Sequence, residues 1–189
     1  MDNIKILNNF SEEVHKVLKE YFEKKTLEYA TWSTQHHACH IVEKEDKKYL
    51  KTLFPLAPSE FHLYKVIPNC MLGAHIDRGR RTALQVAMNH NDGFLTFTQY
   101  NDAKLTPDLT KNHRPYRKGE KGIIVNEGPL FFIYEEDKFE KVGTSIPYLQ
   151  NTSLAHGGFN YSDIDRFFWS ISFKQEKFDY VCDAFKEWA

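Results

Sequence analysis

The sequence lacks a cysteine framework, a long apolar run and an excess of charge of one sign. Its three cysteines, Cys39, Cys70 and Cys182, show no CxxC spacing, and this odd, unpatterned set fits a reducing compartment better than a disulfide scaffold. The first residues contain no apolar run of the signal-peptide type, and no stretch approaches the ~18 apolar residues that span a membrane. We therefore expect a cytoplasmic protein with no membrane partner.

The balance of charge argues against one class of function. The chain has 25 basic and 26 acidic residues, so it has no net positive charge with which to neutralise phosphates. We therefore expect no nucleic-acid partner. Free amino acids, peptides, protein side chains and small metabolites are all left open as substrates, and nothing in the sequence indicates an oligomeric state.

The chain does have ample material for a core. Its 189 residues are 41% hydrophobic and 15% aromatic, which predicts one globular domain over residues 1–189. Fifteen Phe and ten Tyr favour strands, because aromatic side chains suit a pleated, half-buried surface. Ser11 can cap a helix whose apolar stripe runs over residues 14–22, and the same period predicts a second helix at 178–185.

Between these helices the sequence reads mostly as strands. The predicted strands cover residues 61–67, 82–89, 93–100, 122–125, 129–135 and 167–173. The turn signal Asn91-Asp92-Gly93 predicts that its two flanking strands pair as a hairpin. Residues 101–121 are polar and read as a long loop, which we expect to fold over a substrate. The fold class is therefore mainly β (α+β), with helices at both ends.

The segment GAHIDRGRRTAL, residues 73–84, carries the first candidate site. His75 and Asp77 lie two positions apart at the end of a predicted strand, so both side chains point to one face and can meet one ion. A second histidine would complete a site of two histidines and one carboxylate, which is typical of non-haem iron(II) oxygenases. Taken alone, the HxD pattern also fits a charged surface turn. The HHACH segment at 36–40 does not match a closed zinc site.

The second candidate segment, residues 151–173, follows about eighty positions later. His156 lies in a turn of small residues, and Arg166 opens an apolar strand ten positions further on. A buried arginine needs a carboxylate partner, because an unpaired buried charge is very costly. A guanidinium binds a carboxylate through two parallel hydrogen bonds. The alternative is a surface ion pair between Arg166 and Asp163 or Asp165.

Together these motifs resemble the iron(II)- and 2-oxoglutarate-dependent dioxygenase superfamily, nearest to its aspartyl- and prolyl-hydroxylase-like branch. HIDRGRRTALQVAMN resembles the superfamily's strand with HxD, an arginine and a leucine, and NTSLAHGGFN with DRFFWSISF resembles its closing motifs. The resemblance covers residues 61–173. It implies a double-stranded β-helix, a cupin-like jelly roll of two facing antiparallel sheets. It also implies a hydroxylase that uses Fe(II), 2-oxoglutarate as cosubstrate and molecular oxygen.

The resemblance also implies roles for individual side chains. Those that would hold the iron are His75, Asp77 and His156. Those that would bind 2-oxoglutarate are Arg166, at its distal carboxylate, and Arg81, Tyr64 and Ser170. Many relatives have Arg-x-Ser, whereas Ser170 follows Arg166 by four positions. Two other interpretations stay open: a cupin-like protein that binds metal without turnover, and a metal-dependent enzyme that does not use 2-oxoglutarate.

Overall fold

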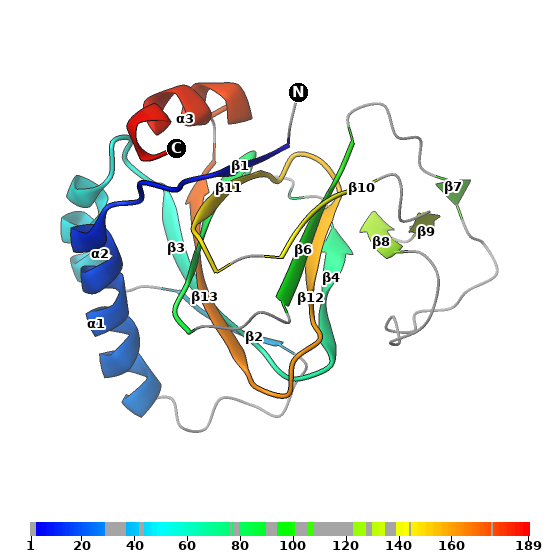
Figure 1. The fold of residues 1–189 in the computed structure, drawn as a ribbon, viewed down its shortest axis with the longest axis horizontal. Coiled ribbons are helices and arrows are strands. Elements are labelled where there is room, and N and C mark those ends of the chain that lie inside the picture. Colours follow the sequence, from blue (N-terminus) through cyan, green and yellow to red (C-terminus); the bar gives the residue numbers. More distant parts are fainter. Residues whose placement is uncertain are drawn as a thin grey trace.

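The computed structural model describes most of the chain outside the predicted loop. The described residues are 3–28, 37–41, 44–75, 77, 80–89, 94–100, 106–107, 123–127, 130–134, 139–143, 145–174 and 176–189. The predicted loop at 101–121 falls outside them except for a two-residue strand, Thr106–Pro107, so its role as a lid stays a prediction. The described residues form two β-sheets and a few helices, which confirms the expected mainly β class (Figure 1).

The first sheet carries strand β1 (Ile4–Ile6) and, on its central strands, many of the buried core residues. Within the described residues it has six strands in the spatial order β1, β11 (Tyr148–Asn151), β5 (Thr82–Ala87), β13 (Arg166–Phe173), β3 (Glu60–Val66) and β2 (His37–Ile41). All neighbouring pairs in it are antiparallel. Strand β13 lies centrally between β5 and β3, so its side chains reach both faces of the sheet at its middle.

The second sheet faces the first. Within the described residues its seven strands are β10 (Phe139–Val142), β6 (Phe94–Gln99), β12 (His156–Asn160), β4 (Cys70–His75), β8 (Ile123–Glu127), β9 (Leu130–Tyr134) and β7 (Thr106–Pro107). Strands β4 and β8 pair in parallel, so this sheet departs from the purely antiparallel arrangement expected. Figure 1 shows β8, β9 and β7 on the side of the molecule away from the helices.

The chain crosses between the two sheets repeatedly. Strands β3 and β5 lie in the first sheet and β4 and β6 in the second, and β10 to β13 then alternate between the sheets in the same way. The predicted hairpin between the strands at 82–89 and 93–100 is therefore wrong. Strand β5 is buried along nearly its whole length and pairs with β11 and β13, whereas β6 pairs with β10 and β12. The turn residues 91–93 lie outside the described residues.

Three α-helices and two short 3-10 helices accompany the sheets in the described part of the chain. They are α1 (Glu12–Glu28), α2 (Lys44–Leu50), η1 (Lys51–Leu53), α3 (Phe178–Ala184) and η3 (Lys186–Trp188). The Ser11 hydroxyl accepts a hydrogen bond from the Val14 amide at 3.3 Å, which confirms the predicted cap of α1. No described helix has the length and apolar character needed to cross a membrane.

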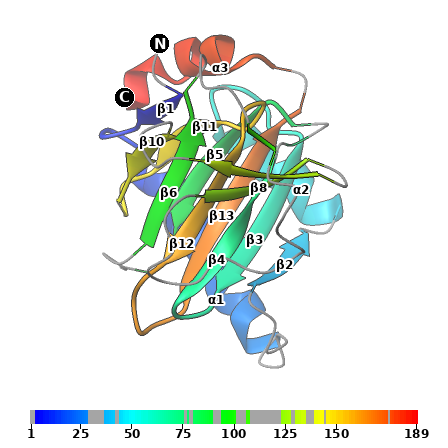
Figure 2. The same cartoon turned by 90° about the vertical axis from the view of Figure 1, so that its right-hand side faces the viewer.

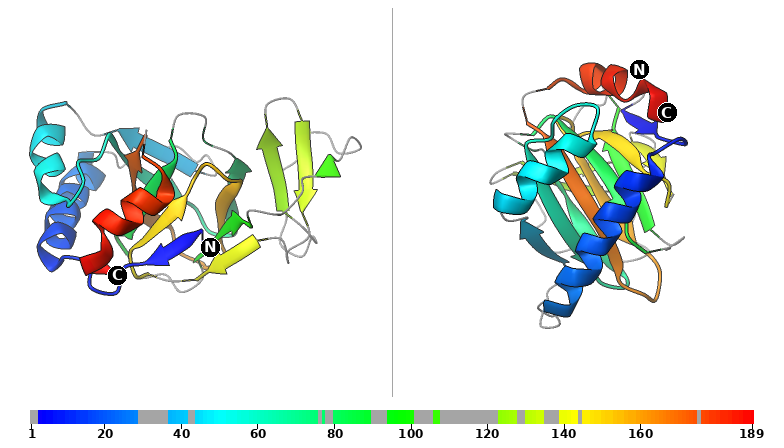
Figure 3. Two further views of the ribbon diagram at one scale, coloured as in Figure 1. Left: turned by 90° about the horizontal axis from the view of Figure 1, so that it is seen from above. Right: turned by 90° about the vertical axis from the view of Figure 1, so that its left-hand side faces the viewer.

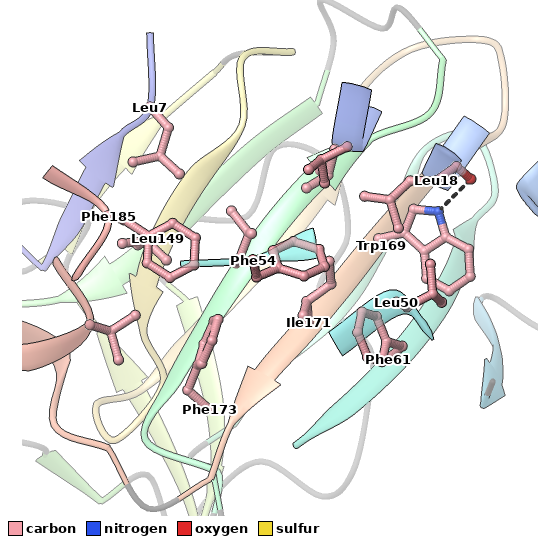
Figure 4. Packing of buried hydrophobic residues seen from close by; sticks show 14 of the residues in the cluster. Leu7, Leu18, Leu50, Phe54, Phe61, Leu149, Trp169, Ile171, Phe173 and Phe185 are labelled. Carbon is pink, nitrogen blue, oxygen red and sulfur yellow. Dashed lines mark hydrogen bonds between the residues drawn. The ribbon is translucent and has the colours of Figure 1, made fainter. Parts of the chain in front are cut away.

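The helices cover the outer face of the six-stranded sheet. Figure 3 shows α1 and α2 across that face, with α3 at one end of it. The side chains that they bury include those of Leu18, Leu50, Phe61, Trp169 and Phe185, each at most 2% exposed (Figure 4). Burying one such side chain contributes about 1.5–3 kcal/mol. The apolar core therefore lies between sheet and helices, and the space between the two sheets is left for other side chains.

Candidate active site

The inner face of the six-stranded sheet carries a pocket lined mainly by residues whose side chains bear a polar group. From that sheet the pocket receives Tyr64, Gln85, Tyr148, Gln150, Phe168 and Ser170. From the facing sheet it receives Thr96, His156 and Gly157, and Arg80 reaches it from the segment after β4. The strand register brings three of these residues together, because Tyr148, Gln85 and Ser170 are Cα partners in a row across β11, β5 and β13. Figure 2 shows the two sheets one behind the other.

His156 and Asp77 meet at the edge of this pocket. His156 is the first residue of β12 and is 3% exposed, so it does not lie in the turn expected from its small neighbours. Gly157 and Gly158 belong to the strand itself, where glycine permits the close approach of neighbouring backbone. The His156 Nε2 atom lies 3.5 Å from the Asp77 Oδ2 atom. Two of the three predicted metal ligands are therefore brought together.

The hydrogen bond on the far side of the imidazole fixes its tautomer. His156 Nδ1 lies 2.9 Å from the Leu154 carbonyl oxygen. A carbonyl oxygen only accepts, so Nδ1 carries the hydrogen and the neutral ring presents its lone pair at Nε2. That lone pair faces the Asp77 carboxylate. Two electron-rich atoms at this separation repel each other unless a cation or a proton lies between them, and imidazole nitrogen with carboxylate oxygen is a donor set that divalent cations accept.

The separation of these two atoms also suits one ion. Nitrogen and oxygen ligands lie about 2.0–2.2 Å from an ion such as zinc, so two of them are about 3.0 Å apart at a right angle and about 3.4 Å apart at a tetrahedral angle. The observed 3.5 Å is close to the upper value. The described residues thus fit a divalent cation, although no group of three His, Cys, Asp or Glu side chains comes together among them.

Residue 75, the remaining predicted ligand, is placed by its backbone alone. His75 ends β4 and is the Cα partner of His156 in β12. The next pair is Leu72 with Gly158, so β4 carries one extra residue there and forms a bulge. Bulges bend a strand locally and are common beside active sites. The side chain of His75 lies outside the described part of the structure.

Thr152 holds the segment that carries Asp77. The Asp77 amide donates to the Thr152 carbonyl at 3.2 Å, and the Thr152 amide donates to the Arg81 carbonyl at 3.0 Å. The Thr152 hydroxyl donates to the Arg80 carbonyl at 3.0 Å, and Thr152 itself is fully buried. These three bonds tie residues 77–81 to the end of β11. They explain Thr152 as a clamp for the segment after β4.

Arg166 opens β13 and is 2% exposed. Its Nη1 donates to the Asn89 carbonyl at 3.2 Å, and burial lowers the pKa of the Arg166 guanidinium while nearby Tyr148 raises it in part. Burial excludes the alternative of a surface ion pair, and the Asp165 carboxylate instead binds Lys65 at 3.0 Å. Arg166 shares a face of β13 with Phe168 and Ser170, both of which line the pocket.

The other predicted cosubstrate residues fall in different places. Tyr64 and Phe168 stack in the pocket with ring centroids 5.4 Å apart, and the Ser170 hydroxyl accepts a hydrogen bond from Arg80 at 3.0 Å. The side chain of Arg81 is exposed, whereas its neighbour Arg80 is half-buried and lines the pocket. The structure therefore gathers Tyr64 and Ser170 at the site and places the Arg81 side chain at the surface.

Sequence reasoning missed a relay of two glutamines in the pocket. The Gln150 amide nitrogen donates to the Phe97 carbonyl at 3.2 Å and lies 2.9 Å from the Thr98 hydroxyl. The Gln150 amide oxygen then accepts a hydrogen bond from the Gln85 amide nitrogen at 3.2 Å. The Gln85 amide oxygen is buried and has no hydrogen-bond partner among the described atoms. A glutamine within an apolar strand, as in TALQVA, was the signal that could have found it.

Tyr148 is a further pocket residue that the sequence did not reveal. Its phenol is buried and hydrogen-bonded to Thr96, whose hydroxyl donates to the Gly157 carbonyl at 3.1 Å. Burial raises the pKa of the Tyr148 phenol, an effect that Thr96 and the Arg166 charge reduce only in part. The phenol is therefore protonated at neutral pH and can donate a hydrogen bond.

Comparison with known proteins supports the architecture. No family model matches the sequence, and no curated protein matches it. HygX from Streptomyces hygroscopicus, in a structure with nickel and 2-oxoglutarate bound, superposes with a TM-score of 0.51 at 10% identity over 90% of this chain and 81% of its own. A prolyl-4-hydroxylase from Pseudomonas putida gives 0.51 at 9% identity over 92% of this chain and 91% of its own. The vicilin of hazelnut (Corylus avellana) gives 0.45 at 9% identity over 75% of this chain, which spans 30% of that longer chain. The first two similarities show a shared fold.

Proposed function

We propose that the protein is an Fe(II)- and 2-oxoglutarate-dependent dioxygenase that hydroxylates an amino acid, a peptide or a small metabolite, on a double-stranded β-helix. The observation that carries the proposal is the imidazole of His156 facing the carboxylate of Asp77 at 3.5 Å beside a polar pocket. The strand alternation between two sheets is that of a jelly roll. The fold shared with HygX, whose structure contains nickel and 2-oxoglutarate, and with a prolyl-4-hydroxylase adds support.

Three residues would hold the iron in this proposal: His75, Asp77 and His156. His156 offers Nε2 because its Nδ1 donates to the Leu154 carbonyl, and Asp77 is held by the clamp of Thr152. His75 would be the third ligand, and its position as the Cα partner of His156 supports this choice. When bound, the iron and 2-oxoglutarate supply the activation of molecular oxygen, with 2-oxoglutarate converted to succinate and carbon dioxide.

The pocket would orient 2-oxoglutarate by charge and hydrogen bonding. Arg166 binds the distal carboxylate, since a guanidinium buried on the inner face is stabilised by an anion and matches a carboxylate with two parallel hydrogen bonds. Tyr148 lies close enough for the Arg166 charge to affect its pKa, so its protonated phenol lies near the guanidinium. Arg80 takes the place that the resemblance gave to Arg81, because Arg80 is the one that lines the pocket.

The apolar part of the pocket would limit water. Tyr64 and Phe168 stack with an interplanar angle of 13° and form one wall. We place the substrate on the open side of the metal centre, covered by the segment at 101–121. Deleting that segment should abolish substrate hydroxylation while leaving iron binding intact. Hydroxylation at the wild-type rate after the deletion would remove the lid from the proposal.

The proposal is tested by anaerobic reconstitution with Fe(II) and 2-oxoglutarate. We expect the weak visible absorption of an iron–2-oxoglutarate chelate in the wild-type protein and its loss in Asp77→Ala and His156→Ala. Metal binding without this absorption and without succinate formation would instead favour a cupin-like binding protein. Metal-dependent turnover of a substrate without 2-oxoglutarate would favour a different enzyme class.

Arg166 is tested separately from the metal ligands. Losing a charge-assisted hydrogen bond costs about 1.5–3 kcal/mol, so Arg166→Ala should raise the 2-oxoglutarate concentration at half-saturation roughly 10–100-fold. Metal affinity should not change, because Arg166 is not one of the proposed ligands. An unchanged requirement for 2-oxoglutarate would show that Arg166 serves only the packing of β13.

A further inference from the structure

Arg80 makes a set of contacts that joins the metal-binding segment to the central strand of the larger sheet. Its Nε donates to Asp77 Oδ2 at 2.5 Å. Its Nη1 lies 3.0 Å from the Ser170 hydroxyl and 3.3 Å from the Ser172 hydroxyl. One planar guanidinium therefore connects the segment after β4 with two positions of β13 that share a face.

The oxygen that Arg80 contacts is the one that faces the histidine. Asp77 Oδ2 is both the acceptor for Arg80 Nε and the atom 3.5 Å from His156 Nε2. A carboxylate oxygen has two lone pairs, so it can accept from Arg80 on one side and face an ion on the other. The orientation of this carboxylate is therefore set by Arg80.

The two serines give Arg80 a fixed support. Ser170 is 1% exposed and Ser172 is fully buried, and both lie on β13 between β5 and β3. Asp77, in contrast, lies on a segment whose described residues 77, 80 and 81 bond through their backbone to Thr152. The guanidinium thus connects the Asp77 carboxylate to the sheet. An arginine can do this because its planar guanidinium holds several donors in fixed directions, whereas a lysine has a single flexible ammonium group.

We propose that Arg80 is the positioning residue of the metal centre, holding the Asp77 carboxylate in its metal-binding orientation, with Ser170 and Ser172 as its anchors on β13. This inference rests on the proposed metal site but not on 2-oxoglutarate. It gives Ser170 a role in supporting Arg80. It also assigns a function to an arginine that the sequence patterns did not single out.

Arg80 affects metal binding in two opposite ways, through its charge and through its contact with Asp77. Whether metal binding becomes weaker or stronger in an Arg80 variant shows which of the two dominates. A positive guanidinium near a divalent cation weakens metal binding by repulsion, so its removal for electrostatic reasons alone would strengthen binding. Removal of a residue that orients a ligand weakens metal binding, typically by about 10–100-fold. The positioning role therefore predicts weaker binding in spite of the charge lost.

The experiment is a titration of the purified full chain with Ni(II), followed by calorimetry. Arg80→Ala should weaken Ni(II) binding by about 10–100-fold. Arg80→Lys should lose nearly as much, because it keeps the charge but not the fork. Arg81→Ala is the matched control, since it removes the same charge from the exposed neighbour, and it should leave the Ni(II) affinity unchanged.

The anchors provide a second, independent arm. Ser170→Ala with Ser172→Ala should weaken Ni(II) binding in the same direction as Arg80→Ala and add little when combined with it, because all three act through one network. The absorption of bound Co(II) should change in Arg80→Ala, since the geometry of its carboxylate ligand changes. Thermal unfolding of the metal-free variants checks that they are folded. If Arg80→Ala does not fold, the test is made with Arg80→Lys.

Unchanged or tighter Ni(II) binding in Arg80→Ala would overturn the inference, and so would wild-type affinity in Arg80→Lys. The failure of the broader proposal looks different. A wild-type protein that binds Ni(II) but not 2-oxoglutarate would remove the dioxygenase while leaving Arg80 as the positioning residue, provided that the variants lose metal as predicted. A wild-type protein that binds no Ni(II) would overturn both.

Discussion

The two faces of the six-stranded sheet are built from the same strands and differ in almost every other respect. On β13, Trp169 and Ile171 point outward into the apolar layer beneath the helices and are fully buried. Their neighbours Phe168 and Ser170 point inward and line the pocket. Successive side chains of a strand alternate between its faces, so one strand contributes to both regions.

The difference shows how stability and chemistry are separated in this molecule. The outer face is held by apolar contacts such as the ring pair of Tyr21 and Trp169, whose centroids are 5.6 Å apart. The inner face is held by hydrogen bonds among buried polar groups, such as the relay from Gln85 through Gln150. Changes on the outer face should therefore cost more stability than changes on the inner face, which also carries the site.

The largest expected effect is that of Trp169→Ala on the outer face. The Trp169 indole is fully buried and its Nε1 donates to the Leu18 carbonyl at 3.1 Å. Removing a buried aromatic side chain typically costs about 3–5 kcal/mol, and urea denaturation would measure the loss. Tyr180→Ala is the control, because Tyr180 is 54% exposed. Equal losses from the two changes would contradict the role of Trp169 in the apolar core of the outer face.

A smaller effect is expected from Gln150→Leu on the inner face. Gln150 is 2% exposed, and its loss leaves the Gln85 amide without its acceptor. A buried polar group left unsatisfied costs about 1–3 kcal/mol. Replacing both glutamines by leucine should cost less than the sum of the single changes, because both partners are then apolar. Additive losses in urea denaturation would mean that the relay is not a unit.

A pH-dependent effect is expected from His62, which lies on the inner side of β3 opposite Ser170. Burial, together with the Arg80 charge, lowers the pKa of His62 from its usual 6.5. The folded state therefore disfavours the protonated ring. Its stabilising contribution is complete above pH 6.5 and is lost as the pH falls through the folded-state pKa. His62→Gln should flatten the fall in stability below that pH, and an unchanged slope would exclude His62 as its source.

The smallest effect concerns Cys182 on the outer side. Burial, with Asp179 nearby, raises the pKa of the Cys182 thiol to about 12. The thiolate is the reactive form, so Cys182 should resist iodoacetamide at pH 8 in the folded protein and react after unfolding in urea. Peptide mass mapping measures this for Cys182 alone. Rapid alkylation of the folded chain would show that the outer layer is more open than described.

Local patterns in the sequence predicted much of the fold. The six predicted strands correspond to β3, β5, β6, β8, β9 and β13, and the helix capped by Ser11 is present. The pairing was not predicted, because which strands become neighbours depends on non-local packing. The Asn91-Asp92-Gly93 signal therefore suggested a hairpin between strands that lie in different sheets.

The site divides in the same way. The motif spacing led to Asp77 and His156, which the structure brings together, and to Arg166, which is buried on the inner face. It did not distinguish Arg80 from Arg81, since neighbouring residues differ only in the direction that the backbone gives them. The Gln85–Gln150 relay joins strands 65 positions apart and has no local signature beyond a glutamine in an apolar strand.

The central claim is that Asp77 and His156 share one cation with His75. A crystal structure of the Zn(II)-loaded protein, with the anomalous signal of the metal, tests it most directly. The account predicts a single peak about 2.0–2.2 Å from Asp77 Oδ2 and His156 Nε2, with His75 as the third protein ligand. An imidazole of residue 156 turned away from that peak, or a metal bound elsewhere in the chain, would contradict it.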